Sequence, residues 1–563
     1  MKWHYCSLFV FVFSLTSVQF FAQGTYIPLG SDAYHIIDRL DIRYGRLLPI
    51  PHTSVKPYQR KTAAEIAETM LLSNLPFNKR QKFELQYLVD ENSEWLDSLQ
   101  SRTSWPLWKF YREPASLFHV NVKKDFSLKI NPILAFRVAG ESGNKEILFV
   151  NTRGLELRFN IRQRVGFYFF ITENQTRPPR YVQRRITEFD YIPGNGYWKE
   201  FRRTGIDYFE PRGYIDVNVL RYISLQFGYD RHFIGNGFRS FYLSDFAAPF
   251  LFLKMNLKVW RFNYQTIWAE LINQYKRGAD RELPKKYAAF HHLNLNVAHF
   301  LDIGFFEGVI FNRRNHFELH YLNPVIFYRA IEQSLGSPDN ALIGFDIKAN
   351  AFNHLQVYSQ FILDEFNLRE IVQNKGWWAN KFAWQLGAKY IDLVPNLDLQ
   401  AEWNMARPFI YTHNLGDNVT ANYTHYNQPL AHPLGANFYE FAAIGRYRIL
   451  KNLQLSLKYI HSTYGEDSTD AASGLLTHFG GNILRNTTAE TVRGVYENKI
   501  AQGARAKQNY FDIMLTYQPW HNIYVDAQFL YRNKDSKLNQ RDEKTYYFGI
   551  GARMNIAYKQ YEF

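Results

Sequence analysis

The sequence predicts an all-β transmembrane barrel of about 18 antiparallel strands, preceded by a small N-terminal α-helical bundle. Two observations carry this prediction. From about residue 116 onward, apolar residues recur at every second position, which is the period of a strand with one apolar and one polar face. The connections between these runs alternate between tight turns and long loops, as they do in outer-membrane barrels.

Residues 1–23 have the form of a secretory signal peptide, with Lys2 and His4 ahead of the apolar run LFVFVFSLTSV. We expect cleavage near Ala22 and export to the outer membrane. The single cysteine, Cys6, lies inside this segment, so the mature chain is expected to have no thiol for disulfides or cysteine catalysis. No later stretch offers the roughly 18 uninterrupted apolar residues that a transmembrane helix needs.

Residues 24–115 are predicted to form a periplasmic helical region. Ser31 is a good N-cap for a first helix, and residues 62–65 (TAAE) have the capping-box pattern at the start of a second. A third helix is expected from Asn78, with Gln81 at the capping-box position and leucines along one side. Three short helices would form either a small periplasmic bundle or a plug.

Residues 116–563 are predicted to form the barrel, with long extracellular loops. In the clearest run, residues 397–405, apolar and polar side chains alternate without exception. The other predicted strands are 126–138, 152–161, 164–172, 214–220, 223–230, 253–261, 263–272, 288–300, 302–311, 343–351, 354–363, 380–391, 438–449, 453–463, 509–518, 523–531 and 545–558. Residues 116–124 are left unassigned as a link from the helices.

The sixth predicted strand shows what each face of the wall would contact. In residues 253–259 (LKMNLKV), four apolar side chains share the face suited to lipid, whereas Lys254, Asn256 and Lys258 share the face suited to water. The loop before it contains Gly-Asn-Gly at 235–237, which permits backbone conformations that a β-carbon would resist. An ordinary turn with a solvated ion pair is the simpler interpretation of this loop.

The composition fits a barrel with a polar lumen. Aromatic residues make up 17% of the chain, while the mean hydropathy is only −0.36. That combination is expected where aromatic girdles flank a short lipid-facing band. The terminal Phe563 resembles the C-terminal aromatic signal of outer-membrane barrels. The alternative, a soluble protein of several sheets, would need another reason for the alternating short and long connections.

The formal net charge is +14, and the isoelectric point is near 9.3. In an exported protein, nucleic acid is not an expected partner. The excess charge therefore indicates anionic glycans, lipid phosphates or simple solvation. Outer-membrane lipid is an expected partner of any such barrel.

No catalytic, metal-binding or cofactor motif stands out, so the protein is not expected to be an enzyme. His291 and His299 share a face of one predicted strand, but eight residues separate them, which is too far for one metal ion. A lumenal set of serine, histidine and aspartate remains conceivable, although no spacing selects one.

Binding is better supported than catalysis. The loop at 173–213 interleaves arginines with aromatic residues, and arginine pairs bidentately with carboxylates while flat rings lie against sugar faces. An acidic polysaccharide would suit both. The candidate glycan-binding residues are Arg177, Arg180, Tyr181, Arg184, Arg185, Trp198, Arg202 and Arg203. Six carboxylates in the same loop favour a second interpretation, a self-neutralising folded loop.

Two long motifs resemble a known family. The segments IGNGFRSFYLSDFAAPFLFLK and LNPVIFYRAIEQSLGSPDNALIGFD are similar to the capsule-assembly Wzi family. The opening IPLGSDAYHIIDRLDI and the later SVKPYQRKTAAEIA place the resemblance closest to its RemB-like gliding-motility branch. The motif positions are Gly235, Gly237, Arg239, Ser244, Asp245, Asn323, Pro324, Arg329, Glu332, Asp339 and Asn340.

This resemblance implies an 18-stranded outer-membrane barrel with a helical bundle on the periplasmic side. Wzi-type proteins attach capsular polysaccharide to the cell surface, and the RemB-like branch is associated with gliding. The expected function is therefore to bind or organise surface polysaccharide, with possible contacts to surface motility or secretion machinery. A porin for saccharides or peptides, and a surface adhesin or scaffold, are the alternatives.

Overall fold

The computed structural model describes most of the chain from residue 24 to residue 563. The described residues are 24–45, 47–48, 52–73, 75–96, 116–122, 125–162, 164–273, 278, 282–313, 316–336, 338–413, 420–469, 476–485, 487, 494–538 and 541–563. The predicted signal peptide, residues 1–23, lies outside them. Among the described residues, no helix is long and apolar enough to cross a membrane.

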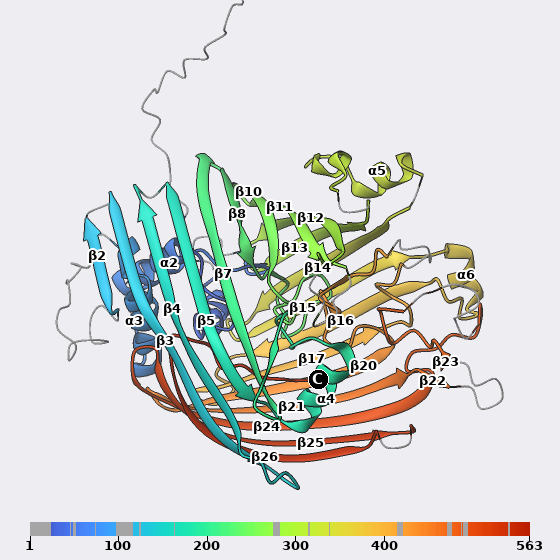
Figure 1. The fold of residues 1–563 in the computed structure, drawn as a ribbon. Helices are drawn as coiled ribbons and strands as arrows, with labels where there is room; N and C mark the ends of the chain where they lie inside the picture. Colours follow the sequence, from blue (N-terminus) through green and yellow to red (C-terminus); the bar gives the residue numbers. More distant parts are fainter. Residues whose placement is uncertain are drawn as a thin grey trace, which may run out of the picture.

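The chain forms a closed antiparallel barrel of 18 wall strands, which confirms the predicted fold class (Figure 1). The wall strands are β3 (Phe126–Glu141), β4 (Leu148–Ile161), β5 (Val165–Arg177), β7 (Gly205–Leu220), β8 (Ile223–Asp230), β10 (Phe250–Val259), β11 (Phe262–Ile272), β12 (Lys285–Ala298), β13 (Leu301–Phe311), β14 (Asn340–Ala351), β15 (Leu355–Glu365), β16 (Lys381–Tyr390), β17 (Leu397–Ala406), β20 (Phe438–Leu450), β21 (Leu453–Glu466), β24 (Ala504–Trp520), β25 (Ile523–Ser536) and β26 (Glu543–Met554). The ring closes where β26 pairs with β3.

The two faces of the wall follow the predicted alternation. On β10, Leu253 is 38% exposed and pairs across the strands with Trp268, while the neighbouring Lys254 is 3% exposed and points into the lumen. Large apolar side chains such as Phe345 and Phe548 stand on the outer face and are 55% exposed. This outer band is the surface that lipid contacts in barrels of this kind.

Short and long connections also alternate as predicted. Tight turns gather at one end of the barrel, for example at 221–222, 260–261 and 451–452. At the other end lie the long segments 178–204, 231–249, 312–339, 407–437 and 467–503. Several are shorter than the predicted loops because the strands run on past the lipid band. As a result, Arg177 ends β5 and Asn340 begins β14.

Helices α1 (Ala33–Tyr44), α2 (Arg60–Leu72) and α3 (Lys79–Glu91), followed by the 3₁₀ turn η1 (Ser93–Trp95), form a helical unit inside the tight-turn end of the ring (Figure 1). The capping box of α3 is present as predicted, with Asn78 and Gln81 exchanging hydrogen bonds. The box predicted at 62–65 is wrong, because α2 already begins at Arg60.

The unassigned segment 116–124 contains a strand, β2 (Phe118–Val122). It pairs with the first half of β3, Phe126 to Ile130, where β26 does not reach, since that strand pairs with β3 only from Leu134 to Glu141. Short elements decorate the connections: β1 (Val55–Lys56), β6 (Lys199–Phe201), β9 (Phe233–Ile234), β18 (Thr424–His425), β19 (Gln428–Pro429), β22 (Ser468–Thr469), β23 (Leu476–Thr477), α4 (Arg180–Phe189), η3 (Leu319–Leu322), α5 (Tyr328–Ser334) and α6 (Leu368–Gln373).

Candidate functional site

The lumen is occupied from the tight-turn end by the helical unit. Tyr26 lies over Lys254, with the ammonium 4.9 Å from the ring centroid. Lys254, Asn256 and Lys258 face a cavity of only about 40 Å³ that the helical unit closes on the other side. Ion pairs hold the unit in place, among them Asp38 with Lys389 at 2.7 Å.

The connection 231–249, here called the inner loop, folds into the lumen rather than away from the barrel. Its strand β9 pairs with β1 of the helical unit. The backbone N–H groups of Phe238 and Arg239 donate to the carboxylate of Glu402 on the wall at 2.7 and 3.0 Å. A β-carbon on Gly237 would lie 2.5 Å from that carboxylate, so the Gly-Asn-Gly motif permits this close approach.

Arg239 ties the inner loop to two other parts of the chain. Its guanidinium donates to both oxygens of Glu440 at 3.1 and 3.3 Å and to the carbonyl of Glu562 at 2.6 Å. Burial alone would lower the pKa of Arg239, but these carboxylates outweigh it and raise the pKa. The solvated ion pair considered for this loop is therefore wrong: Arg239 is buried with Glu440, while Asp245 is exposed and lines a second cavity.

Two further motif residues, Ser244 and Gly235, also hold the inner loop in place. The backbone N–H of Ser244 donates to the carbonyl of Leu430 at 2.9 Å, which joins the inner loop to the connection 407–437. The Ser244 hydroxyl accepts a hydrogen bond from the N–H of Phe246 at 3.2 Å. Gly235 has a φ of 144°, and its N–H donates to the carbonyl of Ser54 in the helical unit at 2.8 Å.

The last residues, 555–563, turn inward after β26, and the C-terminus lies inside the ring beside α4 (Figure 1). Phe563 is buried, and its ring lies 4.4 Å from the guanidinium of Arg185. Tyr181 donates its hydroxyl to the carbonyl of Tyr561 at 2.8 Å, and burial raises the pKa of Tyr181 well above its usual range. Phe563 therefore does not end a wall strand, since β26 stops at Met554, and its resemblance to the C-terminal aromatic signal stays a prediction.

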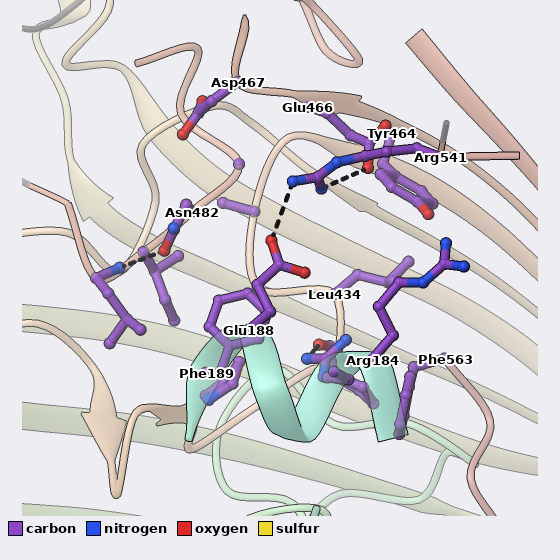
Figure 2. Close-up of a pocket in the computed structure, with 18 of the residues that line it drawn as sticks. Arg184, Glu188, Phe189, Leu434, Tyr464, Glu466, Asp467, Asn482, Arg541 and Phe563 are labelled. Atoms are coloured by element: carbon purple, nitrogen blue, oxygen red, sulfur yellow. Dashed lines mark hydrogen bonds and ion pairs between the residues drawn. The ribbon is translucent and has the colours of Figure 1, made fainter. Parts of the chain in front are cut away.

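Above these residues, at the long-connection end, lies a cavity of about 300 Å³, here called the outer cavity. Helix α4 forms one side of it, and the ends of β21 and β25 with the connections that follow them form the other (Figure 2). Arg184 and Glu188 rise from α4 into the cavity, and Arg541 reaches across toward them. Their side chains are 40 to 50% exposed, so solvent reaches the site.

The charges around the outer cavity are paired rather than free. Arg541 contacts Glu188 at 3.4 Å and Glu466 at 3.3 Å, and Lys534 contacts Glu466 at 2.8 Å. Burial alone would raise the pKa of Asp467, but the hydrogen bond to His478 and the nearby charge of Arg485 outweigh burial and lower the pKa. The cationic lining residues are Arg184, Arg185, Arg485, Arg532, Lys534 and Arg541, and the carboxylates are Glu188, Glu466, Asp467 and Glu543. Cations are therefore in modest excess.

Aromatic side chains also line the outer cavity. Phe189 on α4 and Tyr464 on β21 are half-buried, each with part of its ring open to the cavity. Asn482 also lines the cavity, and its side-chain oxygen accepts the N–H of Leu484 at 3.0 Å. The arrangement combines partly exposed guanidinium groups, amide groups and aromatic faces, the functional groups that contact sugars.

The structure brings only three of the eight predicted loop residues to this cavity: Tyr181, Arg184 and Arg185. Arg177 pairs with Glu146 in the connection between β3 and β4, and Arg180 pairs with Glu141 at the end of β3. Trp198 is buried. Arg202 and Arg203 are exposed in the turn between β6 and β7. The self-neutralising interpretation thus describes part of this loop.

Sequence reasoning missed the other half of the cavity. Tyr464, Asn482, Lys534 and Arg541 come from the last third of the chain, some 280 to 360 positions away from α4. Their local sequence resembles any polar loop of an outer-membrane barrel. Only the closure of the ring places them opposite α4, so no local signal could have found them.

Most of the second motif stretch lies on the outside of the wall, whereas Asn340, the first residue of β14, points into the lumen. Arg313 pairs with Asp339 through two contacts of 2.7 Å, and Asn340 donates to the carbonyl of Ala421 at 3.1 Å. Arg329 pairs with Glu332 at 2.6 Å. Asn323 and Pro324 form the turn before α5.

A second cavity of about 240 Å³ lies inside the ring between the helical unit and the inner loop, and both Arg60 and Asp245 line it. Among the residues that the structure describes, no group of three or more histidine, cysteine, aspartate and glutamate side chains is placed to hold a metal ion.

Neither the protein-family models nor the curated proteins compared with this chain give a match. Among solved structures, the chain is similar to Escherichia coli Wzi, an outer-membrane protein involved in group 1 capsule assembly and described as a carbohydrate-binding β-barrel. The TM-score is 0.57 at 12% identity, over 95% of this chain and 100% of Wzi. This chain has a Wzi-like fold. At this identity, the Wzi-like fold says nothing by itself about a shared ligand.

Two further structures, OprD and OccK8 of Pseudomonas aeruginosa, match with TM-scores of 0.42 and 0.41. They are 10% and 9% identical over 77% and 76% of this chain, and 97% of each of those chains is covered. Scores this low carry no argument about this chain. The Wzi-like fold is that of an outer-membrane barrel.

Proposed function

We propose that this barrel binds a surface polysaccharide at the outer cavity and so attaches or organises it at the cell surface. One observation carries the proposal. The chain fills the lumen with the helical unit, the inner loop and the C-terminal residues, yet keeps a solvent-reached cavity of about 300 Å³ among the long connections. A barrel built to pass solutes has no need of three plugging segments, whereas a binding protein needs a fixed outer site.

The lining favours an acidic polysaccharide. A uronic acid carboxylate forms bidentate pairs with guanidinium groups, and Arg184 and Arg541 present such groups from opposite sides of the cavity. Because Arg541 already contacts Glu188 and Glu466, a bound carboxylate exchanges with existing partners rather than filling an empty site. The expected affinity per sugar is therefore modest, and attachment of a long polymer depends on repeated contacts.

The Wzi-like fold also supports the proposal of polysaccharide binding, since Wzi is described as a carbohydrate-binding barrel involved in capsule assembly. The role of this chain as a non-enzymatic barrel, its export by residues 1–23, and the periplasmic side of residues 24–115 belong to the same proposal. So does a glycan-binding role for three of the predicted loop residues, Tyr181, Arg184 and Arg185, which line the cavity, whereas the other five lie outside it.

The test is a glycan array of neutral and uronic-acid oligosaccharides, probed with the purified barrel in detergent. We expect binding to acidic glycans, with the double variant Arg184→Gln/Arg541→Gln weaker by tenfold or more, because a hydrogen bond to a charged group contributes about 1.5–3 kcal/mol. The matched control is Arg202→Gln/Arg203→Gln, which removes two exposed arginines outside the cavity. Equal losses in both double variants, or no binding by the parent, would contradict the site.

Planar-bilayer conductance separates this function from that of a porin. A barrel with a filled lumen is expected to conduct no steady current, whereas stable open-channel steps would favour transport of saccharides or peptides. A deletion strain then tests the physiological role. Loss of capsule or slime with normal gliding supports attachment, and a gliding defect with normal polysaccharide favours the RemB-like, motility-linked role or a surface scaffold.

A further inference from the structure

Residues 316–336, here called the outer flap, lie against the outside of the wall instead of over the mouth of the barrel. In Figure 1, α5 stands apart from the ring beside β12 to β14. The indole N–H of Trp268 donates to the carbonyl of Tyr321 at 2.9 Å, and Tyr264 donates its hydroxyl to the carbonyl of Pro324. Both wall residues are on the outward face of β11, because they pair with the outward-facing Leu253 and Leu257.

The outer flap covers polar side chains that would otherwise face lipid. His291 pairs across the strands with Thr266 and with Glu307, so all three point outward, yet none is more than 6% exposed. The Tyr328 ring stacks on His291 at 3.8 Å, and the N–H of Arg329 donates to Glu307 at 3.0 Å. Charged side chains on the lipid face of a barrel are costly, and the outer flap removes these from that face.

The exposed side of the outer flap carries several large apolar side chains, together with the side chains of His320 and Arg329, which are 64% and 57% exposed. Leu319 is 71% exposed, Val325 85% and Phe327 61%. The Phe327 ring meets Phe305 of β13 edge to face at 5.7 Å, and Phe305 meets Phe345 of β14 at 5.3 Å. The apolar surface of the outer flap therefore continues directly into the outer band of the wall.

Several backbone groups at the tip of the outer flap have hydrogen-bond partners within the chain, which lowers the cost of placing them in lipid. The side-chain oxygen of Asn323 accepts the N–H groups of Val325 and Ile326 at 3.0 and 3.3 Å. Pro324 has no N–H, and its carbonyl accepts the Tyr264 hydroxyl. The Phe327 carbonyl accepts the N–H of Ala330 at 3.0 Å. Asn323 and Pro324 thus reduce the number of unpaired backbone polar groups in this irregular turn.

We propose that the outer flap is immersed in the apolar part of the membrane, with Val325 and its neighbours among lipid acyl chains. Its contact with Phe305 lies six residues below the end of β13 at Phe311. At about 3.3 Å per residue, that is roughly 20 Å along the tilted strand, so the contact lies beside the lipid-facing middle of the wall and not at its outer end. Lipid is the occupant because the exposed apolar side chains of the outer flap are continuous with the lipid-facing wall, and the one polar side chain at the tip, Asn323, uses its oxygen to accept two backbone N–H groups.

The test uses spin labels on single cysteines in the mature chain, which has no cysteine if residues 1–23 are removed. Val325→Cys reports the flap tip. Ile347→Cys, 44% exposed on the outer face of β14, reports lipid, and Val495→Cys, 46% exposed in the connection 467–503, reports water. Collision rates with oxygen and with a water-soluble nickel chelate are measured for the full barrel in phosphatidylcholine vesicles and in outer-membrane fragments.

We expect the label at 325 to match the label at 347 in both preparations, with oxygen access several times greater than nickel access. The proposal is overturned if the label at 325 behaves like the label at 495, since the tip then lies in water. It is also overturned if outer-membrane fragments shield 325 from both reagents while 347 stays open to oxygen, because a protein partner then covers the flap.

Discussion

Asp398 offers the sharpest test of how the helical unit is held in the barrel. This lumen-facing carboxylate is 2% exposed. It accepts hydrogen bonds from Arg39 and from Arg80, the latter at 2.5 Å, and lies 3.0 Å from His35. Both guanidinium groups are about 5% exposed or less. The substitution Asp398→Asn keeps the size of the side chain and removes its charge from these buried partners.

Removing one partner of a buried ion pair costs about 3–5 kcal/mol. Arg39 keeps Glu84 at 3.3 Å, and Arg80 keeps the same carboxylate at 2.7 Å, so we expect the lower end, about 3 kcal/mol. At about 1.4 kcal/mol per factor of ten, opening of α1 and α3 becomes roughly a hundredfold more frequent. Backbone hydrogen exchange measured by mass spectrometry reports that opening helix by helix.

The matched control is Asp125→Asn, because the pair of Asp125 with Arg162 is about three-quarters exposed on both sides. Exposed pairs contribute about 0–1 kcal/mol, so this variant is expected to exchange like the parent. Unchanged exchange of α1 and α3 in Asp398→Asn would refute the argument that this carboxylate holds the unit.

Three further outcomes are expected. Burial alone would raise the pKa of Glu94, but Lys129 and Arg158 lower it to about 2. The stability that this group contributes is therefore present above the ordinary carboxyl pKa, about 4.3, and is lost as the pH falls toward about 2. Hydrogen exchange of the helical unit should quicken over that fall in pH, and it should quicken less in Glu94→Gln. Gly237→Ala meets the wall carboxylate at 2.5 Å and is expected to cost about 1–3 kcal/mol in urea unfolding, whereas Gly140→Ala, with nothing within 4 Å, should cost less; equal costs would argue against the close approach. Phe563→Ala removes the ring under α4 and should weaken glycan binding while the barrel remains folded, as heat-modified gel mobility reports; unchanged binding would separate the C-terminal residues from the site.

The wall of the barrel could be predicted because its physics is local. A strand with lipid on one side and water on the other must alternate, and residues 397–405 do so in the sequence and in β17 alike. The same rule could have found β2, since Phe118, Val120 and Val122 alternate with polar residues. Only five residues long, that strand is too short for the pattern to stand out.

The interior could not be predicted in the same way. Arg239 reads as a loop residue, yet its partner Glu440 lies 201 positions away. The pairing of Arg39 with Asp398 spans 359 positions. No period in the sequence marks such contacts, because each depends on how the ring closes and on which connections fold inward. The outer cavity shares this property, so the predicted loop supplies only the α4 side of it.

Glu91 of α3 contacts the wall on both sides of the place where the ring closes. It pairs with Arg158 on the second wall strand at 3.0 Å and also with His521 and Asn522, in the turn that precedes the next-to-last wall strand, at 3.0 and 2.6 Å. One carboxylate therefore touches both sides of the seam where β26 meets β3. The helical unit therefore joins the first and last hairpins of the wall from inside the ring, which adds a side-chain link across the closure to the backbone pairing of β26 with β3.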